Sequence, residues 1–367
     1  MAKIDIRNHF EGFFSGKKVL ITGHTGFKGS WLTILLHQLG AQVYGYALNP
    51  PTNPSLFELA GVDKIVHTTI GDIRNFDLLY SVIQQIKPEI IIHMAAQPLV
   101  NMSYKNPRET YEVNVMGIVN LFEAVRLTGG VKSIVNVTTD KCYENNEWYW
   151  GYRENDRLGG FDPYSNSKAC SELVTSAFTN SFFNPMNYKI HGTAIASARA
   201  GNVIGGGDWA EDRLIPDIFR SIERNEKVRI RYPYSIRPWQ HVLEPLTGYL
   251  MLSKNLYEHG IKFSGAWNFG PNDDDAKNVE WITKQICELW GGNADFEIEN
   301  KIHNHEANFL KLDCSKSKSQ LKWNPKWNII TTLHSIVDWN KACYSQNDML
   351  EITKKQISDF FNSKNLI

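Results

Sequence analysis

The chain has 367 residues, with 39 lysines and arginines balancing 39 aspartates and glutamates. This balance leaves no overall positive charge to hold a nucleic acid or an anionic membrane, so neither class of partner is expected. The length exceeds what one hydrophobic core usually supports, which indicates two domains.

The first clear element is a short strand that leads into a glycine-rich turn. Residues 19–21 form a short apolar run, and Gly23, Gly26 and Gly29 follow at spacings of three before a helical apolar pattern. Glycines let the backbone approach a ligand, and the unpaired N–H groups of a helix's first turn favour an anion such as a pyrophosphate. The turn predicts a nucleotide cofactor, although a glycine turn without a ligand is the alternative and the commoner spacing is G-x-G-x-x-G.

Further strands are expected at 41–48, 65–70, 89–93 and 132–137, separated by helical or loop segments. This alternation predicts an α/β fold with a doubly wound, parallel, Rossmann-type sheet. The second strand ends near Ala47 or Leu48 without the acid typical of NAD binding or the arginine typical of NADP binding. A long helix is expected at 107–128, where Asn114 interrupts the apolar face. A buried polar residue in a helix is usually a packing detail.

Two motifs further along the chain carry the chemistry. Thr139 and Asp140 follow the strand at 132–137, at the sheet edge where open α/β folds bind ligands, although a polar turn is the alternative. Tyr164 and Lys168 open a helix four residues apart, so they share one face, and the ammonium is expected to lower the pKa of the phenol toward neutrality. A tyrosinate beside a nicotinamide ring can take a proton from a sugar hydroxyl while hydride leaves the same carbon.

With these motifs, the chain resembles the extended branch of the short-chain dehydrogenase/reductase superfamily, and within it the nucleotide-sugar-modifying enzymes. The matching segments are 22–29, 71–74, 93–97, 114–117, 139–140, Tyr164 with Lys168, and 199–205. Segments 140–143, 150–154, 207–209 and 237–241 resemble the nucleotide-sugar 4,6-dehydratases that act on CDP-glucose. The resemblance implies NAD-dependent dehydration in dideoxysugar and O-antigen (lipopolysaccharide) synthesis, with C4 oxidation, loss of water across C5 and C6, and hydride return to C6.

The resemblance also implies roles for individual residues. Catalysis would use Thr139, Asp140, Lys141, Tyr164 and Lys168. The cofactor would contact Gly23, Thr25, Gly26, Phe27, Lys28, Gly29, Asp72, Ile73, Ala95, Ala96, Gln97, Asn114, Tyr164 and Lys168. The polar candidates for the sugar nucleotide are Asn202, Arg213, Arg231, Arg237 and His241.

Position 141 departs from the related dehydratases, many of which follow the Thr-Asp pair with a glutamate that takes the C5 proton. Here the residue is Lys141, which can act as a base only when neutral. Burial and nearby positive charge would lower the pKa of this lysine, whereas an ionised Asp140 would raise it. Glu144 or a water molecule is the alternative base.

The expected domain division follows the same resemblance. Residues 1–199, with 239–270 returning, would form the NAD-binding domain. Residues 200–238 and 271–347 would form a smaller, mixed nucleotide-sugar-binding domain, and 348–367 a C-terminal tail. A homo-oligomer, dimer or tetramer, is expected, paired through the helices that start near Pro107 and Asp162.

Several alternatives remain open. A 4-epimerase would use Tyr164 but needs no acid to expel the 6-hydroxyl, and a non-catalytic cofactor-binding regulator would not need Tyr164 or Lys168. The base of the nucleotide, whether CDP, dTDP or GDP, depends on the resemblance alone. His303, His305 and Glu306 match no metal motif, so no metal is expected. The five scattered cysteines, the absence of C-x-x-C pairs and the lack of a recognisable signal peptide or spanning apolar run favour the cytoplasm.

Overall fold

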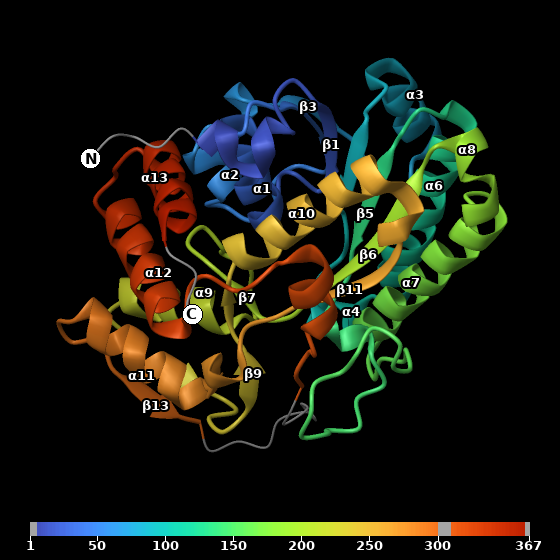
Figure 1. The fold of residues 1–367 in the computed structure, drawn as a ribbon. Helices are drawn as coiled ribbons and strands as arrows, with labels where there is room; N and C mark the ends of the chain where they lie inside the picture. Colours follow the sequence, from blue (N-terminus) through green and yellow to red (C-terminus); the bar gives the residue numbers. More distant parts are fainter. Residues whose placement is uncertain (1–5, 300–309, 364–367) are drawn as a thin grey trace.

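The computed structural model describes residues 6–299 and 310–363. A seven-stranded sheet forms its centre, with strand order β11-β6-β5-β4-β1-β2-β3 and every neighbouring pair parallel (Figure 1). Its strands are β1 (Lys18–Thr22), β2 (Gln42–Ala47), β3 (His67–Ile70), β4 (Ile90–His93), β5 (Ser133–Val137), β6 (Ala194–Ala200) and β11 (Gly265–Phe269). The predicted parallel Rossmann-type sheet is confirmed, and the expected strands agree with the observed ones to within two residues.

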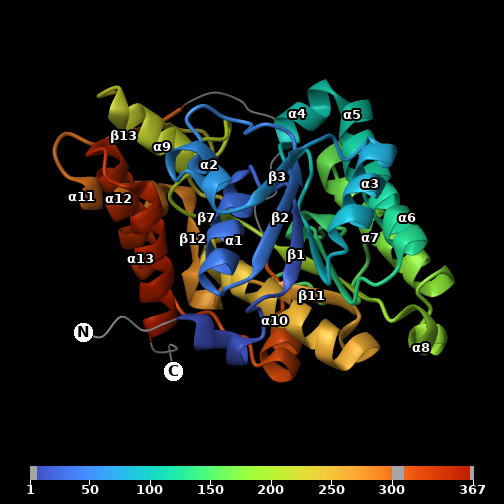
Figure 2. The ribbon, with the colours of Figure 1, turned by 90° about the horizontal axis from the view of Figure 1, so that it is seen from above.

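Helices cover both faces of the sheet, because successive side chains of a strand point to opposite sides. Val19 and Ile21 of β1 pack into the core beneath α1 and α10, whereas Leu20 packs into the core beneath α3 and α6 (Figure 2). The helices around the sheet are α1 (Phe27–Gln38), α2 (Leu56–Leu59), α3 (Phe76–Ile86), α4 (Val100–Lys105), α5 (Pro107–Tyr111), α6 (Gly117–Thr128), α7 (Pro163–Ser181), α8 (Tyr188–His191) and α10 (Leu243–His259).

The helix expected at 107–128 is divided in the structure. A π-helical turn, η3 (Glu112–Met116), separates α5 from α6 and contains Asn114. Other short turns are η1 (Ile6–Gly12), η2 (Val62–Lys64), η4 (Asp140–Cys142), η5 (Pro185–Asn187), η6 (Gly260–Phe263), η7 (Asp273–Asp275) and η8 (Ser317–Leu321). Such π-helical turns are frequent at functional sites, and η3 contacts α7, the helix that carries Tyr164 and Lys168.

A smaller lobe lies beside the sheet and has its own apolar core, which includes Ile218, Ile286 and Leu333 (Figure 1). Its elements are β7 (Val203–Ile204), α9 (Leu214–Glu223), β8 (Val228–Ile230), β9 (Ile236–Pro238), β10 (Gln240–His241), β12 (Ala276–Asn278), α11 (Val279–Trp290), β13 (Phe296–Ile298) and α12 (Ile329–Tyr344). Its strands form three two-stranded ladders, of which β9 with β12 is antiparallel. The division of the chain into two domains at the expected boundaries stays a prediction.

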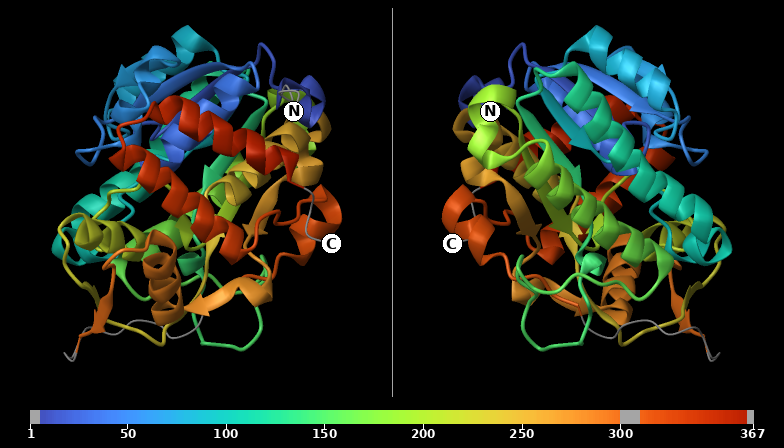
Figure 3. Two further views of the ribbon diagram at one scale, coloured as in Figure 1. Left: turned by 90° about the vertical axis from the view of Figure 1, so that its left-hand side faces the viewer. Right: turned by 90° about the vertical axis from the view of Figure 1, so that its right-hand side faces the viewer.

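The segment expected as a C-terminal tail contains helix α13 (Met349–Asn362). This helix lies beside α12 and contacts α1 and α2 (Figure 3). Trp339 of α12 donates from Nε1 to Thr353 Oγ1 of α13 over 3.1 Å, which ties the two helices together. In the described part of the chain, no helix has both the length and the apolar character needed to cross a membrane.

Candidate active site

The glycine turn between β1 and α1 fits a pyrophosphate. Gly23 has a φ of +79°, and a β-carbon there would lie 2.8 Å from the backbone nitrogen of Ala95, so two strand ends approach closely at this point. Gly29 packs even more tightly, since its β-carbon would meet the Gly23 carbonyl oxygen. Gly26, the N-cap of α1, supplies no side chain to the first helical turn, which leaves the turn's N–H groups available for an anion.

Neighbouring strand ends supply the rest of the predicted cofactor surface. Thr22 is in register with His93, so β1 and β4 end side by side, and Thr22 Oγ1 accepts hydrogen bonds from Met94 and Ala95. Asp72 is already engaged by Arg74, whose guanidinium hydrogen bond lowers the pKa of the Asp72 carboxyl. The other predicted cofactor residues at these strand ends, all partly or fully buried, are Thr25, Phe27, Ile73, Ala96 and Gln97.

Asn114 holds two parts of the site together. Its side chain accepts from the Gln97 N–H over 2.8 Å and donates to the Gln97 carbonyl over 3.0 Å. It also donates to Ser167 Oγ of α7 over 2.9 Å. The polar interruption predicted from the sequence therefore links the segment after β4 to α7, rather than satisfying a local packing need.

Thr139 and Asp140 lie at the end of β5, in the turn η4. Asp140 is 1% exposed, and its Oδ1 accepts from the Thr139 hydroxyl over 3.0 Å. Asp140 Oδ2 has no hydrogen-bond partner among the described residues, which is unusual for a buried carboxylate. Lys141 is half-buried, and its backbone N–H donates to Thr139 Oγ1 over 3.3 Å.

Tyr164 and Lys168 lie one turn apart on α7, as predicted, and both are buried. The expected lowering of the pKa of Tyr164 is wrong for this structure: burial raises that pKa to about 12, the hydrogen bond from Thr139 lowers it and the charge of Asp140 raises it. Lys168 instead donates from Nζ to the Val137 carbonyl over 3.3 Å, and burial lowers the pKa of its ammonium to about 8. Thr139 and Asp140 nevertheless lie close enough to Tyr164 to influence its pKa, so these predicted catalytic groups are neighbours in the structure.

Two cations lie near these groups, one in the glycine turn and one in the smaller lobe. Lys28 interacts electrostatically with Arg213, Lys168, Asp140 and Asp208, and burial, together with its cationic neighbours, lowers the pKa of Lys28 to about 8. Arg213 is bound by Asp208 over 2.8 Å. An anionic ligand between α1 and α9 would therefore meet two positive charges.

The other predicted substrate residues differ in their surroundings. Asn202 is half-buried at a φ of +41°, and its carbonyl accepts from the Gln240 N–H over 3.2 Å. Arg231 is well exposed and pairs with Asp212, whereas Arg237 is buried in β9. His241 is fully buried between Trp31 and Trp327, with ring centroids 5.7 and 4.8 Å away, a position that favours core packing over contact with a sugar. His303, His305 and Glu306 lie outside the described residues.

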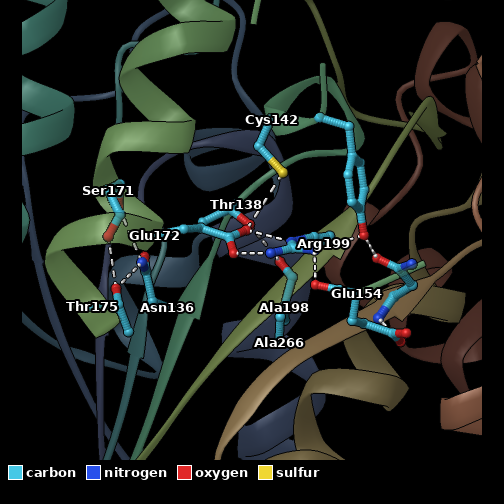
Figure 4. Close-up of polar contacts among 12 residues, drawn as sticks. Asn136, Thr138, Cys142, Glu154, Ser171, Glu172, Thr175, Ala198, Arg199 and Ala266 are labelled. Atoms are coloured by element: carbon cyan, nitrogen blue, oxygen red, sulfur yellow. Dashed lines mark hydrogen bonds and ion pairs between the residues drawn. The ribbon is translucent and has the colours of Figure 1, made fainter. Parts of the chain in front are cut away.

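A buried polar network next to the site was not predicted from the sequence. Glu172 of α7 binds Arg199 of β6, and Thr138 donates to Glu172 Oε1 over 2.6 Å (Figure 4). Glu172 follows Lys168 by four residues, so it lies on the same helix face. A charged residue on that face, together with an arginine inside the apolar segment 194–200, is the signal that could have revealed the pair.

Comparison with known proteins agrees with this geometry. A family model described as GDP-mannose 4,6 dehydratase matches residues 20–336, which is most of the chain. The chain belongs to this GDP-mannose 4,6-dehydratase family. The expected membership of the nucleotide-sugar dehydratases is thereby confirmed at the level of the family.

Individual relatives match this chain over most of its length. A CDP-glucose 4,6-dehydratase of Salmonella typhimurium is 58% identical over 353 residues, covering 96% of this chain and 98% of the relative. A CDP-paratose 2-epimerase of Salmonella typhi is 30% identical and covers 89% and 99% of the two chains. The solved dTDP-glucose 4,6-dehydratase of Bacillus anthracis, in complex with NAD, shares the fold at a TM-score of 0.74 and 22% identity, with 91% and 100% coverage.

Proposed function

We propose that the protein converts CDP-glucose to CDP-4-dehydro-6-deoxyglucose and water, with NAD as a cofactor that is regenerated in each turnover. The packing of α7, which carries Tyr164, against the turn η4, which carries Asp140, has most weight, because it brings a base for oxidation and an acid for elimination together. The CDP-glucose 4,6-dehydratase that shares 58% identity supports this choice of sugar nucleotide.

The glycine turn, the open first turn of α1, and Lys28 fit the pyrophosphate of a dinucleotide. The chemistry supplied by bound NAD is reversible hydride transfer, first from C4 and finally to C6 of the sugar. Solved relatives in complex with NAD support NAD over NADP.

Each catalytic residue then has one task. Tyr164 takes the proton of the 4-hydroxyl, and the Thr139 hydroxyl orients that group. The resulting 4-ketone acidifies C5, from which Lys141 removes the proton. Asp140 protonates the departing 6-hydroxyl, so that water leaves and the C5–C6 double bond forms before C6 is reduced. Lys168, one turn further along α7, would bind the nicotinamide ribose of the cofactor.

Assembly and location belong to the same proposal. Helices α6 and α7 expose Leu127 and Leu173, at 46% and 58%, on the part of the chain expected to form the dimer interface. Burying such side chains against a second copy would favour a dimer. All five cysteines are free thiols, in keeping with the cytoplasmic location expected for an enzyme of dideoxysugar synthesis. Sedimentation of the pure protein tests the oligomeric state.

Incubating the pure protein with glucose linked to CDP, dTDP, UDP or GDP tests the proposed activity. We expect a 4-keto-6-deoxy sugar, recognised by its near-ultraviolet absorbance in alkali, from CDP-glucose at the highest kcat/KM. Preference for another nucleotide would disprove the assigned substrate. Formation of CDP-galactose without the alkaline absorbance would favour the 4-epimerase. Denaturing the protein and identifying any released dinucleotide tests the cofactor.

A further inference from the structure

Glu172 accepts hydrogen bonds from both sides of the catalytic turn. Thr138, immediately before Thr139, donates from Oγ1 to Glu172 Oε1 over 2.6 Å. Cys142, immediately after Lys141, donates from Sγ to the same oxygen over 3.5 Å. Figure 4 shows Thr138 and Cys142 bonded to the Glu172 carboxylate. The turn formed by Thr139, Asp140 and Lys141 therefore lies, in the chain, between two groups bonded to one carboxylate oxygen.

The same carboxylate belongs to the helix that carries the oxidation residues. Glu172 follows Lys168 by about one turn of α7 and Tyr164 by about two. Because α7 is a single regular helix from Pro163 to Ser181, fixing Glu172 fixes Tyr164 and Lys168 relative to whatever Glu172 binds. One side chain thus sets the distance between the two halves of the catalytic apparatus.

Arg199 completes this arrangement. Its guanidinium binds both oxygens of Glu172, through Nε over 2.7 Å and through Nη2. Its Nη1 donates to the Tyr143 hydroxyl over 2.7 Å and to the Glu154 carbonyl over 3.0 Å, at the two ends of the loop 144–153. Arg199 and Glu172 are 2% and 5% exposed, so solvent hardly competes with these bonds.

A buried ion pair is a weak stabilising device in general, since desolvation opposes the Coulomb attraction. Hydrophobic residues of the same volume would hold α7 against β6 equally well. They would not, however, present an acceptor to Thr138 and Cys142 on either side of the catalytic turn. The pair therefore matters at this location for the hydrogen bonds that Glu172 accepts, rather than for its charge.

We propose that Glu172, held by Arg199, is a positioning residue that keeps the Thr139–Asp140–Lys141 turn in register with Tyr164 and Lys168, so that elimination follows oxidation in one geometry. This inference rests on the proposed dehydratase function. Loss of the bonds made by Glu172 would slow elimination more than oxidation. The reason is that Asp140 and Lys141 would shift relative to an α7 that remains in place. Misplacement of about 1 Å can cost about a hundredfold in rate.

Thr138→Val tests the inference with little disturbance, because it preserves shape and leaves the Glu172–Arg199 pair intact. Thr193→Val is the matched control. Thr193 is also buried and donates over 2.7 Å to the Val131 carbonyl, but it precedes the N-terminal end of β6, whereas Arg199 lies near the C-terminal end. The readouts are single-turnover absorbance of reduced nicotinamide, incorporation of solvent deuterium at C5, KM for CDP-glucose, and thermal unfolding.

For Thr138→Val we expect reduced nicotinamide to accumulate, deuterium incorporation to fall about tenfold or more, and KM to change less than about twofold. Thr193→Val should match the parent protein in all but unfolding temperature. Cys142→Ala, which removes the second donor, should shift the balance of the two steps in the same direction. Arg199→Lys keeps the positive charge but loses the planar guanidinium that binds both oxygens of Glu172. It should shift the balance of the two steps more strongly than Cys142→Ala.

A parent-like balance of oxidation and elimination in both Thr138→Val and Cys142→Ala would overturn the inference, whatever their thermal stability. A lowered unfolding temperature with an unchanged ratio of oxidation to elimination would also overturn the inference, because it would show that the network only stabilises the fold. Failure of the parent protein to make a 4-keto-6-deoxy sugar would instead contradict the proposed function.

Discussion

The carboxylate of Asp140 packs directly on the backbone of Gly201. A β-carbon at position 201 would lie 1.8 Å from Asp140 Oδ2 and 2.3 Å from Cγ, so no other residue fits without moving the carboxylate. That oxygen is also the one without a hydrogen-bond partner among the described residues. Gly201, directly after β6, therefore leaves room for a carboxylate whose Oδ2 is positioned by packing, whereas its Oδ1 accepts a hydrogen bond from Thr139.

Gly201→Ala should displace Asp140 and slow dehydration about a hundredfold, with cofactor affinity nearly unchanged. Gly270→Ala is the control, because its β-carbon would meet its nearest neighbours at an ordinary 3.4 Å. Steady-state kinetics and cofactor titration provide the measurement. Parent-like turnover of Gly201→Ala would show that the position of the Asp140 carboxylate does not matter.

Tyr164→Phe and Asp140→Asn should fail at different steps. Without its phenol the protein should form no reduced nicotinamide, because nothing takes the 4-hydroxyl proton. Asp140→Asn should form reduced nicotinamide in a single turnover and then stall, since an amide is no acid for the 6-hydroxyl. Stopped-flow absorbance distinguishes the two. Equal loss of both steps in both variants would contradict this division of labour.

Lys141→Met should retain oxidation but lose exchange of the C5 proton. The amine is the base assigned to C5 here, and methionine preserves much of its length without a basic atom. Mass spectrometry of the product formed in deuterated solvent gives the exchange directly. Incorporation of deuterium at the parent rate would move the role to Glu144 or to a water molecule.

Lys168→Met should stabilise the folded protein while abolishing activity. Burial lowers the pKa of Lys168 from 10.5 to about 8, so between these values the unfolded chain binds more protons than the folded one and stability rises with pH. Below about pH 8 the cost of the buried charge is fully present. There the variant should gain roughly 1–3 kcal/mol in its free energy of unfolding, a gain that fades toward pH 10.5.

Denaturant titrations across this pH range measure the effect, with Lys189→Met, at an exposed lysine of α8, as control. Lys28→Met should flatten the same part of the profile, because the pKa of Lys28 is also lowered to about 8. Above about pH 10 the raised pKa of Tyr164 acts in the opposite direction. A profile for Lys168→Met parallel to that of the parent would disprove the assigned pKa.

Patterns of period two and 3.6 were enough to predict the sheet and the helix face shared by Tyr164 and Lys168, because both depend on neighbours along the chain. The π-helical turn at Asn114 was missed, since its cause is a contact with Gln97, which lies on another strand end. The pKa of Tyr164 was predicted in the wrong direction because the spacing gives the proximity of Lys168 but not the depth of burial.

His241 shows the same limit from another side. A histidine in a polar motif was expected to face the sugar nucleotide, yet tertiary packing encloses it between two tryptophans. The contact between Glu172 and Arg199 was not predicted, because it joins residues 27 positions apart and no local pattern indicates such a pair. Sequence periodicity cannot predict which single polar residues pair with one another across the fold.

Helix α1 is buried at eight consecutive positions, 29–36, because α13 covers part of its surface and the sheet another part. Helix α13 is synthesised after every other described element, so α1 keeps an uncovered apolar side until α13 has emerged from the ribosome. The surroundings of the glycine turn at the start of α1 are thus complete only when α13, the last described helix, packs against α1. Chaperones that recognise exposed apolar helices could therefore bind α1 until α13 packs against it.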